Sequence, residues 1–246
     1  MRIAVAGAAG RMGRAVIESV QADRAFTLAA ALDVAADPAR GIVSDLGAIA
    51  TADVLIDFTR PEGTLEHLEH CKAAVIGTTG FSETQFTAIR DRARSIPIVL
   101  SPNFAIGVNV VFRLAETAAR ALGDAYDIEI VEAHHRHKVD APSGTALKLG
   151  EVISRALQRE GPDVFVHGRH GDTGERPVKQ IGFHAIRGGD IVGEHTVIFA
   201  GAGERVELTV RSQSRMTYAA GALRAAKWLQ GRPAGLYDMS DVLGMR

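Results

Sequence analysis

The first hundred residues alternate between short apolar runs and longer helical patterns. The apolar runs are rich in β-branched residues and predict strands at 3–6, 26–32, 54–58, 74–76 and 96–100. Helical patterns at 14–20, 64–72 and 81–95 separate several of them. Because repeated βα units form parallel sheets, this half predicts a Rossmann-like doubly wound α/β sheet. Ligands of such sheets bind beyond the carboxyl ends of the strands.

A glycine-rich turn follows the first predicted strand and opens the first predicted helix. Gly7 permits a tight turn, Gly10 lets the backbone approach a pyrophosphate, and Gly13 lets the helix pack closely on the strand. The helix start favours phosphate charge. The glycine spacing differs by one residue from the usual dinucleotide fingerprint, so the turn alone leaves a plain βα connection as an alternative.

The end of the second predicted strand favours the dinucleotide interpretation. Asp33 lies twenty residues after Gly13, where an acidic side chain holds the adenosine ribose. The following residue is Val34, whereas a 2′-phosphate requires a nearby cation. We therefore predict a preference for NADH, with NADPH possible. Arg11 and Arg14 remain alternative phosphate partners.

Two further strand ends carry small or hydroxyl residues at 77–79 and 101–104. In a parallel sheet these ends meet at one edge, so their backbone groups are expected to line the same crevice as the glycine turn. Ordinary turn chemistry is the alternative explanation for Thr78, Thr79 and Asn103.

After residue 106 the pattern changes. A helix is predicted at 107–122, and strands at 128–132, 164–167, 178–186, 194–200 and 206–211 surround one long helix at 146–159. This pattern predicts a mostly antiparallel or mixed open sheet with a helix on one face. A last helix at 216–229 is expected to return to the first domain. We predict a dinucleotide-binding domain at 1–105 and 215–246, and a substrate-binding and oligomerisation domain at 106–214.

The run 132–146 concentrates groups that transfer protons and bind anions. If Ser143 caps the predicted helix, the amides of Gly144, Thr145 and Ala146 point outward and form a site for a carboxylate or phosphate. Lys138 is placed to pair with such a carboxylate or to donate a proton. A well-capped helix without a ligand and a solvated lysine are the alternatives.

Three histidines, His134, His135 and His137, precede this turn. Histidine is the natural proton donor at neutral pH. In a strand His134 and His135 would face opposite sides, whereas in a loop both can reach a ligand. We predict no metal site, because neither a cysteine nor a carboxylate cluster accompanies them.

Composition excludes several classes of protein. The chain has 246 residues and a net charge of −1, which argues against dominant attraction to nucleic acid or an anionic membrane. Cys71, the single cysteine, precedes an apolar run and is expected to be a buried hydrophobe. Without a disulfide, signal peptide or run of about 18 apolar residues, a cytoplasmic location is expected.

With these residues in view, the chain closely resembles the dihydrodipicolinate reductase (4-hydroxy-tetrahydrodipicolinate reductase) family of bacterial lysine biosynthesis over nearly its whole length. The most specific mark is the run 132–146, supported by 5–13, 56–61, 75–81, 103–104 and 107–109. Compared with longer relatives, the region 35–52 is short, so one βα unit is expected to be trimmed and to lack its helix.

The resemblance implies reduction of 4-hydroxy-tetrahydrodipicolinate (dihydrodipicolinate) to tetrahydrodipicolinate with NAD(P)H, in diaminopimelate and lysine biosynthesis. It implies that His134 and Lys138 are catalytic. It implies substrate binding by His135, Lys138, Ser143, Gly144 and Thr145. It implies cofactor binding by Gly7, Ala8, Ala9, Gly10, Arg11, Met12, Asp33, Gly77, Thr78, Thr79, Ser101, Pro102, Asn103 and Phe104. It also implies a cytoplasmic homotetramer built through the second domain.

Two alternatives remain. The first is another two-domain NAD(P)-dependent amino-acid dehydrogenase, such as an aspartate or homoserine enzyme, which would not need a lysine and helix start for a second carboxylate. The second is a non-enzymatic dinucleotide sensor, which has no use for a histidine and lysine cluster beside an anion site.

Overall fold

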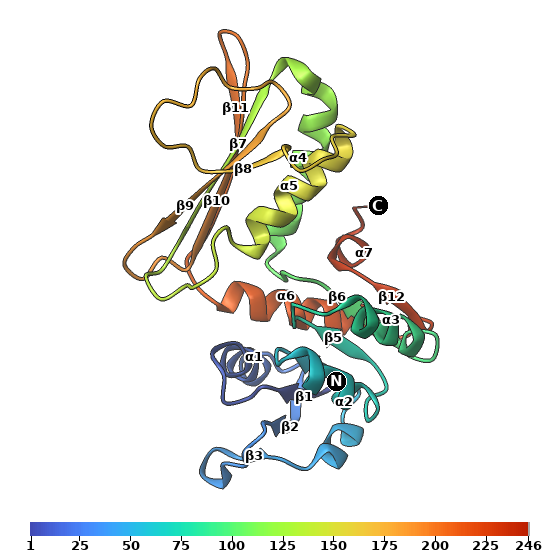
Figure 1. The fold of residues 1–246 in the computed structure, drawn as a ribbon. Helices are drawn as coiled ribbons and strands as arrows, with labels where there is room; N and C mark the ends of the chain where they lie inside the picture. Colours follow the sequence, from blue (N-terminus) through green and yellow to red (C-terminus); the bar gives the residue numbers. More distant parts are fainter. Residues whose placement is uncertain (246) are drawn as a thin grey trace. The chain divides into compact units, whose positions relative to one another are not determined.

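The computed structural model describes residues 1–245. The chain separates into two compact units, one of Met1–Ile106 with the residues from Arg215 onward, the other of Gly107–Ser214 (Figure 1). Helix α6 (Met216–Leu229) follows the second unit in sequence but packs in the first.

A seven-stranded parallel sheet forms the first unit, which confirms the predicted doubly wound α/β class. Its strands are β1 (Arg2–Ala6), β2 (Thr27–Leu32), β3 (Ile42–Val43), β4 (Val54–Asp57), β5 (Ala74–Ile76), β6 (Pro97–Leu100) and β12 (Gly235–Tyr237). Their order is β12-β6-β5-β4-β1-β2-β3. The chain builds outward from β1 in one direction and then from β4 in the other. The strand order therefore reverses between β1 and β4, where such sheets bind ligands.

Helices cover both faces of this sheet. On one face Ile3 and Val5 pack with α1 (Arg11–Ala22) and α6. On the other, Ala4 and Ala6 pack with α2 (Pro61–Leu68) and α3 (Glu83–Arg92). Cys71 is buried in this second cluster, as expected. Burial on both faces explains why the strands read as continuous apolar runs rather than alternating ones.

Several boundaries differ from the prediction for local reasons. Helix α2 begins three residues earlier than predicted, because proline is favoured at the first helical position, where no amide is needed. Strands β3 and β12 and the short helix α7 (Met239–Leu243) were not predicted, since they are too short for a periodic pattern. Between β2 and β4 the chain forms β3 and two 3₁₀ turns, Pro38–Arg40 and Leu46–Thr51, and no α-helix, as the shortened sequence predicts.

The second unit contains a five-stranded mixed sheet, which confirms the predicted open sheet. Its strands are β7 (Asp127–His134), β8 (Phe165–His167), β9 (Ile181–Arg187), β10 (Gly193–Ala200) and β11 (Arg205–Ser212), in the order β11-β10-β7-β9-β8. Helices α4 (Ile106–Leu122) and α5 (Gly144–Ala156) pack against one face (Figure 1). Strand β9 begins three residues later than predicted, since its pairing with β7 and β8 starts only at Ile181.

Candidate active site

The functional groups of the second unit gather where β7 ends. Alternate residues of a strand share a face. Ile128 and Ile130 lie fully buried in the core beneath the helices, and Glu132 and His134 continue the same row. The register places Glu132 beside His195 on β10 and His134 beside Arg187 on β9. The row therefore changes from a hydrophobic core to a polar cluster at the end of the strand.

Glu132 is the centre of this cluster and is only 1% exposed. Its carboxylate accepts two hydrogen bonds from the Arg187 guanidinium, at 2.7 and 2.8 Å, and one from the Ser143 amide at 3.1 Å. His134 Nδ1 lies 2.6 Å from the second carboxylate oxygen. Burial raises the pKa of Glu132, but the bonds from Arg187 and His134 outweigh it and leave the pKa below its ordinary value.

His134 is half-buried and lies edge-on to His195, with ring centroids 5.2 Å apart. Burial lowers the pKa of His134 below its ordinary value; the neighbouring Glu132 opposes that shift without overcoming it, and the positive charges of Lys138 and Arg187 add to it. Burial also lowers the pKa of His195, to about 4. His195 is therefore neutral at pH 7, whereas His134 has a carboxylate that supports its charged form.

Helix α5 begins at this cluster. Ser143 is its N-cap. The Ser143 hydroxyl oxygen accepts a hydrogen bond from the Ala146 amide at 3.2 Å and lies 2.9 Å from His195 Nε2. The expectation that the Ala146 amide faces a ligand is therefore wrong, because the capping serine already satisfies it. A side chain built on Gly144 would meet no atom within 4 Å, so the helix start is open at that residue.

The loop between β7 and α5 carries Lys138. Its ammonium bonds both carboxylate oxygens of Asp140, at 2.8 and 2.9 Å. Arg187 donates to the Asp140 carbonyl at 2.6 Å, which ties this loop to β9. Lys138 also acts on the pKa of His134, so the two predicted catalytic residues are electrostatic neighbours. His135 lies in the same loop with its ring 6.2 Å from that of His137.

The sequence did not predict Arg187 or His195 as part of this site. His195 occupies an inward position of β10, between the buried Gly193 and Val197, and a polar residue in such a row is a recognisable signal. Arg187 ends β9 immediately before two glycines, and nothing local marks it. Glu132 and its partners His134 and Ser143 lie in the predicted run, but its partner Arg187 does not.

At the end of β1 the glycine turn has the geometry that its spacing predicts. Gly7 has a φ of +79°, which glycine adopts without strain. A Cβ on Gly13 would collide with the Gly7 carbonyl, so this glycine allows the close approach of α1 to the strand end. The Asp33 carboxylate accepts hydrogen bonds from the backbone amides of Ala9 and Val34, each at 2.9 Å. Its carboxylate is fixed beside the turn with lone pairs left for ribose hydroxyls.

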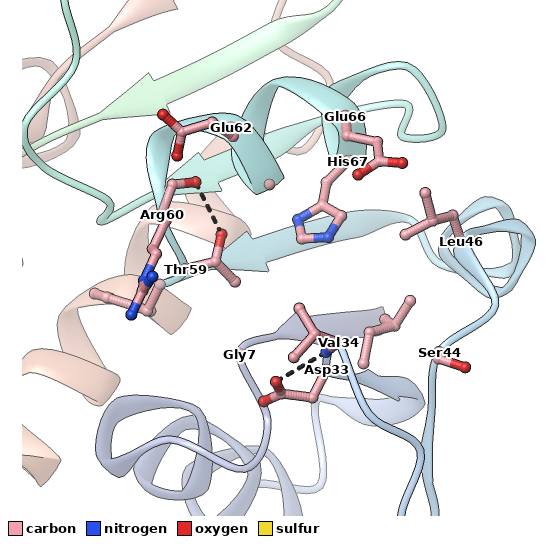
Figure 2. A pocket seen from close by; sticks show the side chains of 13 residues that line it. Gly7, Asp33, Val34, Ser44, Leu46, Thr59, Arg60, Glu62, Glu66 and His67 are labelled. Atoms are coloured by element: carbon pink, nitrogen blue, oxygen red, sulfur yellow. Dashed lines mark hydrogen bonds between the residues drawn. The ribbon is translucent and has the colours of Figure 1, made fainter.

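A cavity of about 760 Å³ lies next to this turn. Its lining comprises Gly7, Leu32, Asp33, Val34, Ser44, Leu46, Phe58, Thr59, Arg60, Glu62, Gly63, Glu66 and His67. Figure 2 shows the side chains of Asp33, Arg60 and His67 around one space. Arg60 and His67 were not predicted. His67 is held by the fully buried Asp57, with Nδ1 2.7 Å from a carboxylate oxygen. The glycine turn and this cavity fit an adenosine dinucleotide.

The other predicted cofactor residues have structural contacts of their own. The Thr78 hydroxyl donates to Asp57 at 3.2 Å, and the Ser101 hydroxyl donates to the Asn103 carbonyl at 2.8 Å. Phe104 is buried in the core of the first unit. A Cβ on Gly77 would collide with the Phe58 ring, so packing alone requires glycine there.

Each helix within residues 1–245 is too short or too polar to span a membrane. In the same part of the chain no three histidine, cysteine or carboxylate side chains are grouped to hold a metal ion.

A nucleotide-type parallel sheet with a glycine turn, joined to a second unit with an acid–histidine pair, defines a two-domain dinucleotide-dependent oxidoreductase. The family model described as dihydrodipicolinate reductase, N-terminus, matches residues 1–104, and that described as dihydrodipicolinate reductase, C-terminus, matches 107–243. The chain therefore belongs to the dihydrodipicolinate reductase family.

Similar proteins agree with this assignment. The chain is 55% identical to the 4-hydroxy-tetrahydrodipicolinate reductase of Aromatoleum aromaticum, with 100% of this chain and 96% of the relative covered. It is 55% identical to that of Burkholderia pseudomallei strain 668, with both chains fully covered. The solved dipicolinate-bound dihydrodipicolinate reductase from Paenisporosarcina sp. TG-14 is 26% identical, with a TM-score of 0.78 and 97% of each chain covered.

Proposed function

We propose that the chain reduces 4-hydroxy-tetrahydrodipicolinate to tetrahydrodipicolinate, with His134 and Lys138 as its proton-transferring residues. The observation that carries the proposal is the half-buried His134 at the end of β7, which is bonded to a buried carboxylate and feels the charge of Lys138. The family assignment supports a reductase of the diaminopimelate and lysine pathway.

The substrate's two carboxylates need cationic and amide partners in the second unit. The Lys138 ammonium, held by Asp140 in this structure, is one such cation and would exchange Asp140 for the ligand. The open start of α5 at Gly144 and Thr145 provides a second anion site, favoured by the helix dipole. Ser143 supports this site from beneath, since its amide and hydroxyl are already bonded.

The proton supply is proposed from the hydrogen-bonded pair of Glu132 and His134. A reduced nicotinamide, when bound, would supply a hydride to the carbon–carbon double bond that is conjugated with the imine once the 4-hydroxyl has left as water, and the imine itself remains in the product. The resulting negative charge requires a proton, and His134 is suited to give it because Glu132 supports its protonated form. His135 and Lys138 complete the polar loop around the substrate. The division of the protons between His134 and Lys138 is part of the proposal.

The first unit is proposed to bind the dinucleotide and to prefer NADH. The Gly7–Gly13 turn would hold the pyrophosphate through its amides, and Asp33 would accept the ribose hydroxyls. Val34 is 98% exposed and offers no charge to a 2′-phosphate, while Glu62 and Glu66 add negative charge to the cavity lining. Arg60 in the same lining is the cation that would limit the preference. Comparing kcat/KM for the two cofactors tests it, and a strong NADPH preference contradicts it.

We also propose a cytoplasmic homotetramer assembled through the second unit. Within residues 1–245, strand β11 is an edge strand paired only with β10, which leaves half of its backbone groups without a ladder partner. Ile186 is 51% exposed on the sheet, a further sign of a surface that a second copy covers. Light scattering of the purified protein tests this assembly, and a monomer at micromolar concentration contradicts it.

The reductase activity is tested by following NADH oxidation with freshly made dihydrodipicolinate synthase product. His134→Gln should lower kcat far more than it raises KM, whereas His170→Gln, an exposed histidine of the same unit, should match the unaltered protein. Turnover of other keto or imino acids in preference to this substrate would instead favour an amino-acid dehydrogenase. Dinucleotide binding without turnover of any of them would favour a sensor.

A further inference from the structure

We infer that Glu132 is the positioning residue for His134. It fixes the imidazole so that the Nε2 atom is the one that exchanges a proton with the substrate. This inference rests on the proposed function, because it specifies how the proton donor of that reaction is oriented. The residue acts through His134 and is not itself expected to contact the substrate.

The first line of support is the geometry of the pair. His134 Nδ1 lies 2.6 Å from a Glu132 oxygen, a distance typical of a charge-assisted hydrogen bond. An ionised carboxylate only accepts, so Nδ1 must carry the proton in this bond. In neutral His134 the lone pair is therefore on Nε2, and in charged His134 the second proton is on Nε2. The nitrogen that exchanges a proton is thus fixed by Glu132.

The second line of support is that Glu132 itself cannot turn away. Arg187 holds both of its oxygens in a bidentate pair, and the Ser143 amide donates to the oxygen that does not face His134. Arg187 is in turn bonded to the Asp140 carbonyl. A carboxylate fixed from three sides, 1% exposed, gives His134 a single ring orientation.

The third line of support is the environment of the charged ring. Burial, Lys138 and Arg187 all disfavour a positive charge on His134, and Glu132 is the group that favours it. The pKa of His134 stays below its ordinary value, and the charge of Glu132 limits that lowering, so Glu132 favours the protonated ring that can act as an acid. This role parallels the carboxylate of hydrolase triads, which holds a histidine in one tautomer.

The test compares Glu132→Gln with a matched control on the same strand. Glu129 also bonds a histidine and arginines, with His184 at 2.7 Å and Arg176 at 2.9 Å, but by strand alternation it faces the other side of the sheet. Glu132→Gln should lower kcat about 10–100-fold with little change in KM, the range found for outer carboxylates that orient a ligand histidine. Glu129→Gln should leave kcat within about twofold.

A double-mutant cycle separates positioning from folding. If Glu132 acts through His134, then Glu132→Gln should cost no further activity once His134→Gln is present. An equal loss in both backgrounds would overturn the inference. The pH profile is a second readout: the limb that falls with rising pH should move to lower pH in Glu132→Gln, because the group that supports protonated His134 is gone.

The imidazole tautomer is measured without any turnover. In protein with ¹⁵N-labelled histidine, the His134 signals, assigned with His134→Gln, should report a proton on Nδ1 and should change in Glu132→Gln but not in Glu129→Gln. A proton on Nε2 alone in the neutral ring would overturn the inference. Because this readout needs no substrate, it stands even if the reductase assay fails, and a failed assay with the expected tautomer would reject the proposed function alone.

Discussion

Replacing Arg187 with methionine should destabilise the protein through the carboxylate it leaves behind. Arg187 makes the bidentate pair with Glu132, whose side chain is 1% exposed, while the arginine itself is 20% exposed. Breaking a fully buried pair by removing one partner costs about 3–5 kcal/mol. The partial exposure of Arg187 places the expected loss at the lower end, ~3 kcal/mol, or a Tm lower by roughly 6–12 °C.

The pH dependence of this loss identifies its cause. In the native protein the pKa of Glu132 lies below its ordinary value of 4.5, so the carboxylate contributes stability above that pH and loses it as pH falls through the folded pKa. Without Arg187, burial is opposed only by weaker donors and the folded pKa rises. The unpaired charge then destabilises the fold at neutral pH and is relieved by protonation. The stability difference should therefore be largest near pH 7–8, shrink as pH falls through the raised folded pKa of Glu132 in the variant, and shrink further below about pH 4.5.

Urea unfolding followed by circular dichroism between pH 4 and 8 measures this difference. Arg211→Met removes an arginine from an exposed pair with Glu194 in the same sheet and serves as the control, with an expected loss below about 1 kcal/mol. A loss for Arg187→Met that is independent of pH would refute the electrostatic argument, because lost packing does not titrate with Glu132.

Three further predictions concern other parts of the molecule. Val34→Arg should raise kcat/KM for NADPH by about 10–100-fold, the effect of one or two charge-assisted bonds to the 2′-phosphate, measured against NADH in the same preparation. Gly13→Ala should weaken NADH binding, measured by calorimetry, and lower Tm, because its Cβ collides with the Gly7 carbonyl; unchanged binding would contradict the role of the turn. His195 should titrate in NMR near pH 4 rather than near 6.5, so the stability it contributes above pH 6.5 should be lost as pH falls toward 4.

Local patterns were sufficient for five of the seven strands of the first unit and for the glycine turn. Spacing along the chain marks Gly13 and Asp33, because the first helix and second strand bring them back to one place whatever the rest of the fold does. The polar cluster of the second unit was predicted only in part. Arg187 and His195 reach Glu132 through the ladders of β9 and β10, 55 and 63 positions further along the chain. Such a register follows from tertiary pairing and not from any local period.

Local sequence patterns also did not predict several of the polar residues that line the cavity of the first unit. Arg60 and His67 line it because α2 begins at Pro61 at the end of β4, next to the strand-order reversal. The sequence predicted that helix to begin three residues later. The alternative of ordinary turn chemistry fits Asn103, whose side chain accepts a hydrogen bond from the Ala105 amide two residues on, whereas Thr78 bonds Asp57 across neighbouring strand ends.

Stability alone does not explain why a carboxylate lies at the end of the core row of β7. Replacing both partners of a buried ion pair with apolar residues is often neutral or stabilising. The free energy of unfolding of the double variant Glu132→Leu with Arg187→Met should therefore lie within about 1–2 kcal/mol of that of the unaltered protein, whereas Arg187→Met alone should lose more. The same double variant should retain NADH binding and lose most of its kcat, since His134 no longer has a carboxylate to orient it. Stability is measured by urea unfolding and turnover by NADH oxidation. Recovery of stability without recovery of turnover would show that Glu132 is needed to position His134. Recovery of both would assign it to folding.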